Sequence, residues 1–164
     1  MNDKKKEQGQ LSRRDFLKMG VSALSFVALL EVGGASLLFM RPRSGDGEYG
    51  GLVSAGAVDS FSPGSVTEFP DGRFYLVRAS DGGFLAMYRR CTHLGCNVKW
   101  EVEQNRFFCP CHASSFNLLG EVENPPAPSA LDTFAVHINE SQVVVDTSRI
   151  QNRDGFAPEQ LAYG

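Results

Sequence analysis

The sequence predicts one all-β domain that follows a single N-terminal apolar helix. Three observations support this expectation. From Leu52 onward, short runs rich in aromatic and β-branched residues are separated by turns of Gly, Pro, Asp and Asn. No stretch after Leu52 shows the 3.6-residue periodicity of an amphipathic helix. Residues 19–40, by contrast, are apolar almost throughout. We therefore expect stacked antiparallel sheets and one membrane-spanning segment.

Three pairs of strands are predicted as hairpins, because each pair flanks a short polar turn. The clearest turn is Ser-Asp-Gly-Gly at residues 80–83. The predicted pairs are residues 74–78 with 84–88, residues 98–100 with 106–108, and residues 134–138 with 143–145. The middle pair is expected to belong to a loop subdomain inserted into the sheets.

The N-terminal segment has the features of an export signal followed by an anchor. The run from Ser12 to Lys18, Ser-Arg-Arg-Asp-Phe-Leu-Lys, is close to the twin-arginine signal, which exports proteins already folded. The apolar run that follows is long enough to cross a bilayer as a helix. Six Lys/Arg precede this run and two follow it. This asymmetry predicts a cytoplasmic N-terminus and a domain on the periplasmic side of the cell membrane.

The composition of the chain changes at four places, and these changes predict its domains. The Gly-rich segment before Leu52 is typical of a flexible linker. The last residues carry no motif and are expected to pack either on the domain or on a partner. The expected parts are the signal region 1–18, the anchor 19–40, the hinge 41–51, the β-domain 52–148 and the tail 149–164.

The charge is divided unevenly along the chain. Residues 1–43 carry eight Lys/Arg and four Asp/Glu, and the remainder carries eight and fifteen, which gives the net charge of −3. A basic leader on an acidic body argues against nucleic acid as a partner. The acidic body is consistent with attraction of a basic electron-transfer protein, and equally with a simple solvated surface.

The chemistry of the chain is concentrated in two short segments. All four cysteines and two of the three histidines lie in Cys-Thr-His-Leu-Gly-Cys at residues 91–96 and Cys-Pro-Cys-His at residues 109–112. Two thiolates and two imidazoles suit a 2Fe–2S cluster in which two His replace two Cys on one iron. The same donor types also suit a tetrahedral zinc site.

These two segments resemble the paired cluster-binding boxes of Rieske iron–sulfur proteins, specifically those of cytochrome bc-type quinol oxidoreductases. The resemblance implies a Rieske-type fold with one 2Fe–2S cluster. Oxygenase-type Rieske ferredoxins lack the additional cysteine pair. The implied assignments are Cys91 and Cys109 on one iron, His93 and His112 on the other, and a Cys96–Cys111 disulfide between the loops.

The resemblance also implies roles for neighbouring side chains. Leu94 is expected to cover the cluster, and the Ser114 hydroxyl is expected to donate to a bridging sulfide. His93 and His112 are the expected catalytic residues, which contact quinol and couple electron transfer to proton transfer. High-potential members of the family carry Tyr where this chain has Phe116. We therefore expect a lower potential here, which suits a donor such as menaquinol.

The resemblance implies the membrane-anchored Rieske subunit of a quinol–cytochrome c reductase, an oxidoreductase complex in which this subunit transfers electrons. Its expected partners are a cytochrome b-type membrane subunit, quinol, and a c-type cytochrome or another periplasmic acceptor. The alternative is the small Rieske subunit of an arsenite-oxidase-like molybdenum enzyme, which also tends to carry a twin-arginine signal. A soluble oxygenase ferredoxin is disfavoured by the anchor, the export signal and the second cysteine pair.

Overall fold

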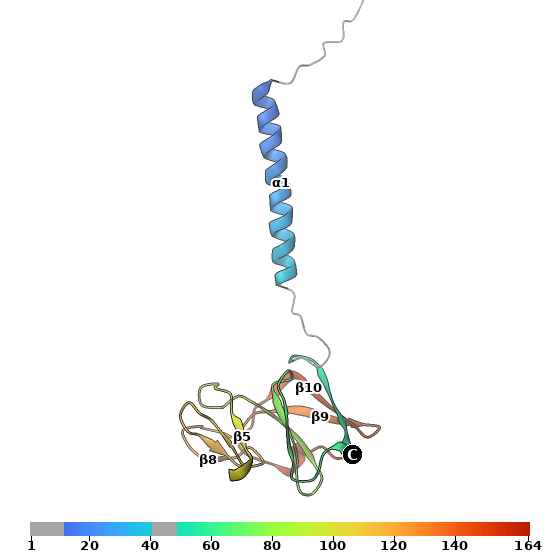
Figure 1. Ribbon diagram of the computed structural model, residues 1–164, viewed down its shortest axis with the longest axis vertical. Coiled ribbons are helices and arrows are strands. Elements are labelled where there is room, and N and C mark those ends of the chain that lie inside the picture. The colour runs from blue at the N-terminus through green and yellow to red at the C-terminus, as the bar shows by residue number, and fades with distance from the viewer. Residues whose placement is uncertain (1–11, 41–48) are drawn as a thin grey trace, which may run out of the picture. The chain divides into compact units, whose positions relative to one another are not determined.

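A computed structural model describes residues 12–40 and 49–164 (Figure 1). The chain divides into two units, residues 1–43 and residues 44–164. The first unit contains one helix and the second contains all the strands. Most of the expected hinge, residues 41–48, and the beginning of the expected signal region, residues 1–11, lie outside the described residues.

The helix α1 runs from Arg13 to Phe39, 27 residues in all. It begins earlier than the expected anchor because the hydroxyl of Ser12 accepts a hydrogen bond from the backbone N–H of Arg14, which caps the first turn. At 1.5 Å per residue it is about 40 Å long, more than the ~30 Å of a bilayer core. None of its residues is buried against the described part of the chain. Its length and apolar surface suit a single-pass membrane anchor.

The second unit is built from two antiparallel sheets, which confirms the all-β expectation. The six-stranded sheet has the order β1-β10-β9-β4-β3-β2 and the four-stranded sheet the order β5-β6-β7-β8. In Figure 1, β5 and β8 lie together on one side of this unit, and β9 and β10 lie on the other. The strands are β1 Leu52–Ala57, β2 Val66–Phe69, β3 Phe74–Arg78, β4 Phe84–Tyr88, β5 Lys99–Glu101, β6 Arg106–Phe108, β7 Ser115–Phe116, β8 Val122–Asn124, β9 Thr133–Asn139 and β10 Gln142–Gln151.

The three predicted hairpins form, and the β3–β4 hairpin shows why. Its turn is closed by the Asp81 carboxylate, which accepts from the backbone N–H of Gly83 at 3.0 Å. Gly82 has a φ of +95°, a conformation that glycine adopts without steric cost. The turn between β5 and β6 is a short 3₁₀ helix, Val102–Gln104. Within residues 49–164 the helices are all short 3₁₀ turns.

The strands β3 and β4 separate two hydrophobic cores. Phe74 and Leu76 point into a core shared with β1, β9 and β10, whereas Tyr75 and Val77 point into a core shared with the four-stranded sheet. Successive side chains of a strand point to opposite faces, so both faces of these two strands are covered. This explains their continuous apolar sequence. Cys91 and Cys109 belong to the second core.

The C-terminal tail is part of the domain. β10 extends to Gln151, so the boundary expected at residues 148/149 falls within this strand. Further on, the backbone of Ala162 exchanges two hydrogen bonds with Phe84, at 2.8 and 2.9 Å. Of the two alternatives for the tail, packing on the domain is therefore the one that the structure adopts.

Arg153 joins this tail by hydrogen bonds to the two segments on either side of β8. Its Nε donates to the carbonyl of Leu131 at 2.6 Å, and its Nη2 donates to that of Leu119 at 2.6 Å. Its Nη1 donates to Oε1 of Gln160 at 2.8 Å. Burial lowers the pKa of Arg153 to about 10, so the guanidinium remains charged at neutral pH. No sequence motif indicated this role.

We expect R153M to lower the free energy of unfolding by about 3 kcal/mol, because it leaves buried acceptors without a donor. R149M is the matched control, since Arg149 is exposed on β10 and its loss should cost less than about 0.5 kcal/mol. Thermal unfolding of the two holoproteins measures the difference. Equal losses in the two variants would contradict this role.

Candidate metal centre

The first loop, residues 91–96, closes on itself through its backbone. The N–H of Cys91 donates to the carbonyl of Cys96 at 2.8 Å, and the N–H of Gly95 donates to the carbonyl of Cys91 at 2.9 Å. Gly95 has a φ of +80°, which turns the chain back toward its start. The shape of the loop is therefore fixed by hydrogen bonds within its own backbone.

The second loop, residues 109–114, repeats this geometry. The N–H of Cys109 donates to the carbonyl of Ser114 at 2.9 Å, and the N–H of Ala113 donates to that of Cys109 at 3.0 Å. Ala113 stands at the position equivalent to Gly95 and has a φ of +60°. The same pattern of bonds at the same spacing gives two matching loops that can hold one centre from two sides.

The four candidate ligands converge from the two loops. Cys91 and Cys109 are each 2% exposed, and their thiols interact with each other. The ring centroids of His93 and His112 lie 4.8 Å apart, with the rings nearly perpendicular. His112 is exposed and His93 half-buried. The thiols thus lie inside the domain and the imidazoles lie at its surface.

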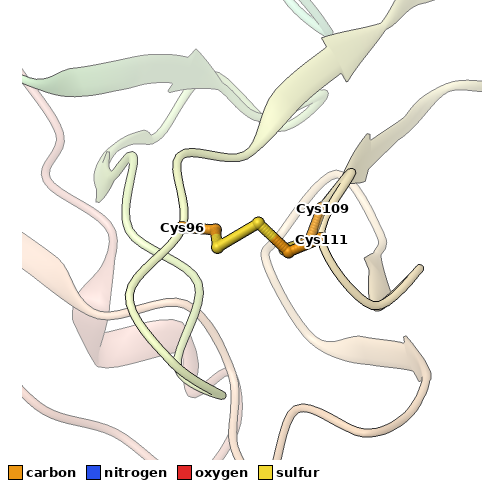
Figure 2. Close-up of side chains that lie close together, drawn as sticks. All are labelled: Cys96, Cys109 and Cys111. Carbon is orange, nitrogen blue, oxygen red and sulfur yellow. A yellow bond between two sulfur atoms is a disulfide. The ribbon is translucent and has the colours of Figure 1, made fainter.

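A disulfide between Cys96 and Cys111 joins the two loops (Figure 2). This is the pair that the resemblance implies. Cys109 lies beside them, with its sulfur within 4.8 Å of theirs. Because Cys96 and Cys111 are bonded to each other, they have no thiolate to offer a metal. Cys109 is the member of this group that remains available as a ligand.

Ser114 connects the second loop to Cys91. Its side chain is fully buried, accepts from the backbone N–H of Ala127 at 3.0 Å, and donates to the sulfur of Cys91. Burial raises the pKa of the Cys91 thiol, and the Ser114 hydroxyl acts in the opposite direction. A buried thiolate at this position suits a bound cation, whose charge stabilises the thiolate.

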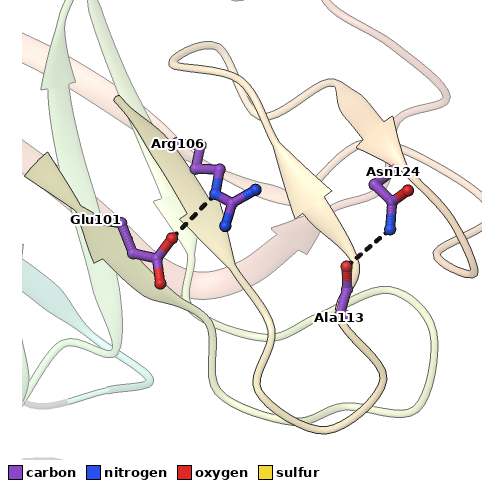
Figure 3. Close-up of polar contacts among 4 residues, drawn as sticks. All are labelled: Glu101, Arg106, Ala113 and Asn124. Atoms are coloured by element: carbon purple, nitrogen blue, oxygen red, sulfur yellow. Dashed lines mark hydrogen bonds and ion pairs between the residues drawn. The ribbon is translucent and has the colours of Figure 1, made fainter. Parts of the chain in front are cut away.

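The proline-containing segment, residues 124–129, supports both loops. The Thr92 hydroxyl donates to the carbonyl of Ser129 at 2.7 Å. The Asn124 side-chain amide donates to the carbonyl of Ala113 at 2.9 Å (Figure 3). No sequence motif indicated these contacts of Thr92 and Asn124. The sequence marks them only by position: Thr92 lies between two candidate ligands, and Asn124 precedes the proline run.

The hairpin that leads into the second loop has its own ion pair. Arg106 on β6 donates from Nε to the Glu101 carboxylate on β5 at 2.9 Å (Figure 3). Both side chains are about one-third exposed, so this pair contributes at most about 1 kcal/mol. It helps to fix the pairing of β5 with β6. It does not reach the centre itself.

Leu94 directly follows the candidate ligand His93 in the first loop and is 70% exposed. Phe116 is fully buried in the core that contains Cys91 and Cys109. The residues of the two loops therefore fit a Rieske cluster: two inner thiols, two outer imidazoles, and a separate disulfide that holds the loops together. A zinc site would use the same four donors.

Comparison with known proteins distinguishes these possibilities. The sequence profile of the Rieske [2Fe-2S] domain matches residues 52–135. The cytochrome b6-f complex iron-sulfur subunit 2 of Synechocystis sp. is 31% identical over 144 residues, which cover 74% of this chain and 76% of that protein. The cytochrome b6-f complex iron-sulfur subunit of Chlorobaculum thiosulfatiphilum is 31% identical over 97 residues, 54% of each chain.

Other relatives match over a shorter part. In the corresponding subunit of Synechococcus elongatus, 41% identity over 70 residues covers 39% of the protein. The chain thus spans about half the length, or less, of most of these relatives. The crystal structure of the plasma membrane Rieske protein PetC3 from Synechocystis has 29% identity and a TM-score of 0.46, over 57% of this chain and 98% of that one. From the matched profile and the match to the Synechocystis subunit, we conclude that the chain belongs to the Rieske [2Fe-2S] family and that its cofactor is a 2Fe–2S cluster.

Proposed function

We propose that this chain is the Rieske electron-transfer subunit of a quinol-oxidising cytochrome b6-f or bc-type complex. The observation that carries the proposal is the pair of matching loops, with buried thiols and surface imidazoles, in a chain whose relatives are named as subunits of cytochrome b6-f complexes. The apolar helix α1 supports assembly with a cytochrome b-type subunit in a membrane.

Within this proposal, the cluster ligands are Cys91 and Cys109 on one iron and His93 and His112 on the other. A Rieske cluster supplies one-electron redox chemistry at about −150 to +300 mV. Because the two cysteines are buried, water is excluded from the side of the cluster that they would hold. We assign quinol contact and proton uptake to the ring nitrogens of His93 and His112 that are not bound to iron, and His112 is the more exposed of the two.

Leu94 contributes an apolar surface beside these histidines, where a quinol ring or the cytochrome b subunit can pack. We place the domain on the periplasmic side and the N-terminus in the cytoplasm, following the basic residues before α1 and the twin-arginine motif. A c-type cytochrome or another periplasmic protein then accepts the electron. Protease treatment of spheroplasts should remove a C-terminal tag, and protection of that tag would reverse this orientation.

Co-purification tests the function directly. Native membranes are solubilised in mild detergent, and the chain is captured by a C-terminal tag. We expect iron together with a dithionite-reduced b-type haem band. Molybdenum without haem b would instead support the arsenite-oxidase-like alternative, which the names of the relatives do not favour. In that case the quinol role of His93 and His112 would be withdrawn.

We further expect F116Y to raise the midpoint potential by about 60 mV. A tyrosine hydroxyl that donates to a ligand sulfur, and is worth about 1.4 kcal/mol more in the reduced state, gives a shift of that size for one electron. F107Y is the matched control, because Phe107 is equally buried in the same core and packs on Trp100 and Tyr75. Redox titration of the holoproteins measures both. The expectation is contradicted if the midpoint potential of F116Y does not rise, or if that of F107Y rises equally.

A further inference from the structure

Three arginines line one cavity next to the first loop. The cavity has a volume of about 430 Å³, large enough for a small ligand. Its wall includes Arg73, Arg89, Arg90, Tyr88, Gly95 and Asn97. None of the four proposed iron ligands lines it. The cavity therefore requires its own explanation.

The backbone fixes the positions of these arginines. Arg73 lies in the turn between β2 and β3 with a φ of +56°, and its carbonyl accepts from the N–H of Arg89 at 3.0 Å. The next residue, Arg90, pairs with Asn97 in an isolated β-bridge. Arg73 is thus held beside the consecutive residues Arg89 and Arg90 by a main-chain hydrogen bond.

Gly95 provides the space for one of the guanidinium groups. A Cβ at this position would lie 2.6 Å from Nε of Arg90 and 2.9 Å from its Nη2. The Arg90 head group therefore packs directly against the first loop. Arg73 is held at the other side by Tyr49, whose ring centroid lies 4.9 Å from its Cζ.

The charge of this cavity is not balanced within the described residues. Arg89 pairs with Glu68 at 2.9 Å, and its buried Nε has no hydrogen-bond partner there. Arg73 and Arg90 make no ion pair in the described part of the chain. Arg73 and Arg90 carry like charges, which repel each other unless an anion offsets them. This concentration is unusual in a body, residues 44–164, that is otherwise acidic.

We propose that this arginine pocket binds a phosphate-type oxyanion. Guanidinium groups present planar pairs of N–H donors that match phosphate oxygens, and converging arginines recognise such groups. Two sources share this chemistry: free inorganic phosphate and the head group of an anionic phospholipid. A lipid head group is one of these sources because the helix α1 suits a membrane anchor.

The test is calorimetric titration of the detergent-solubilised full-length holoprotein. The two probes are inorganic phosphate and dihexanoyl phosphatidylglycerol, with sodium chloride at matched ionic strength as the blank. We expect saturable binding of at least one probe, weakened about tenfold or more in R73Q and R90Q. R149Q, which removes one exposed positive charge elsewhere, should bind like the wild type.

The visible spectrum of the cluster verifies that each variant is folded, and R73Q is the safer variant because Arg90 contacts the first loop. Tighter binding of the lipid assigns the pocket to a phospholipid head group. Equal or tighter binding of phosphate assigns it to the free ion. Absence of saturable binding by the wild type, or an equal loss in R149Q, would overturn the proposal.

Discussion

Replacing Cys109 with serine should abolish the cluster. Cys109 is 2% exposed, has a free thiol, and lies in a loop closed by its own backbone N–H and carbonyl. A serine hydroxyl fits the same space but is not a thiolate, and thiolates are the ligands that this iron requires. We expect iron and acid-labile sulfide to fall about tenfold or more, since even indirect partners of a metal site contribute ten- to a hundred-fold.

The chain provides controls for this experiment. H137A changes the third histidine, which is exposed on β9, and should keep about two irons per chain. H112A should lose the cluster as C109S does. Circular dichroism shows whether each variant retains its β-structure. A cluster that survives in C109S would mean that the ligand assignment is wrong, and about one zinc per chain without iron in the wild type would favour the tetrahedral site.

Loss of the disulfide should have the second largest effect. The double variant C96S/C111S opens a link between positions 15 residues apart. In the chain-entropy model a loop of this length is worth about 3 kcal/mol. We expect the free energy of unfolding to fall by about this amount, and the cluster absorbance to bleach faster in air because the two loops can separate. The double variant is preferred, since a single free Cys111 near Cys109 could exchange partners.

Denaturant unfolding and the time course of the visible spectrum measure the two effects. The wild type treated with a thiol reductant is the matched comparison, because it opens the same bond without a substitution. If C96S/C111S unfolds at the wild-type denaturant concentration and bleaches at the wild-type rate, the disulfide has no supporting role. If only the bleaching rate changes, the bond protects the cluster without stabilising the domain.

The hairpins and the loops were predictable because their determinants are local. Gly82 and Asp81 close the β3–β4 turn through contacts within a few residues. The first loop closes between Cys91 and Cys96, which are five positions apart. Such contacts depend on residue type and spacing, and a sequence displays both directly.

The supports of the centre were not predictable in this way. Thr92 contacts Ser129 across 37 positions, and Arg153 contacts Leu119 across 34. These bonds exist because the four-stranded sheet packs on one face of β3 and β4. A sequence does not state which segments such packing will bring together. The arginine pocket has a different origin. The β3–β4 hairpin brings Arg73 beside Arg89 and Arg90, and the bridge between Arg90 and Asn97 adds the first loop.

The sequence by itself thus determined the apolar helix, the β-hairpins, the two loops and the donor set that indicated a Rieske cluster. Each of these follows from short-range geometry, side-chain chemistry and hydropathy. Only the tertiary structure decided that the tail belongs to the domain, which hydrogen bonds join residues 124–129 to the two loops, and that three arginines share one cavity. The reason is physical: burial and long-range hydrogen bonds depend on how the sheets pack, and packing is a property of the whole chain.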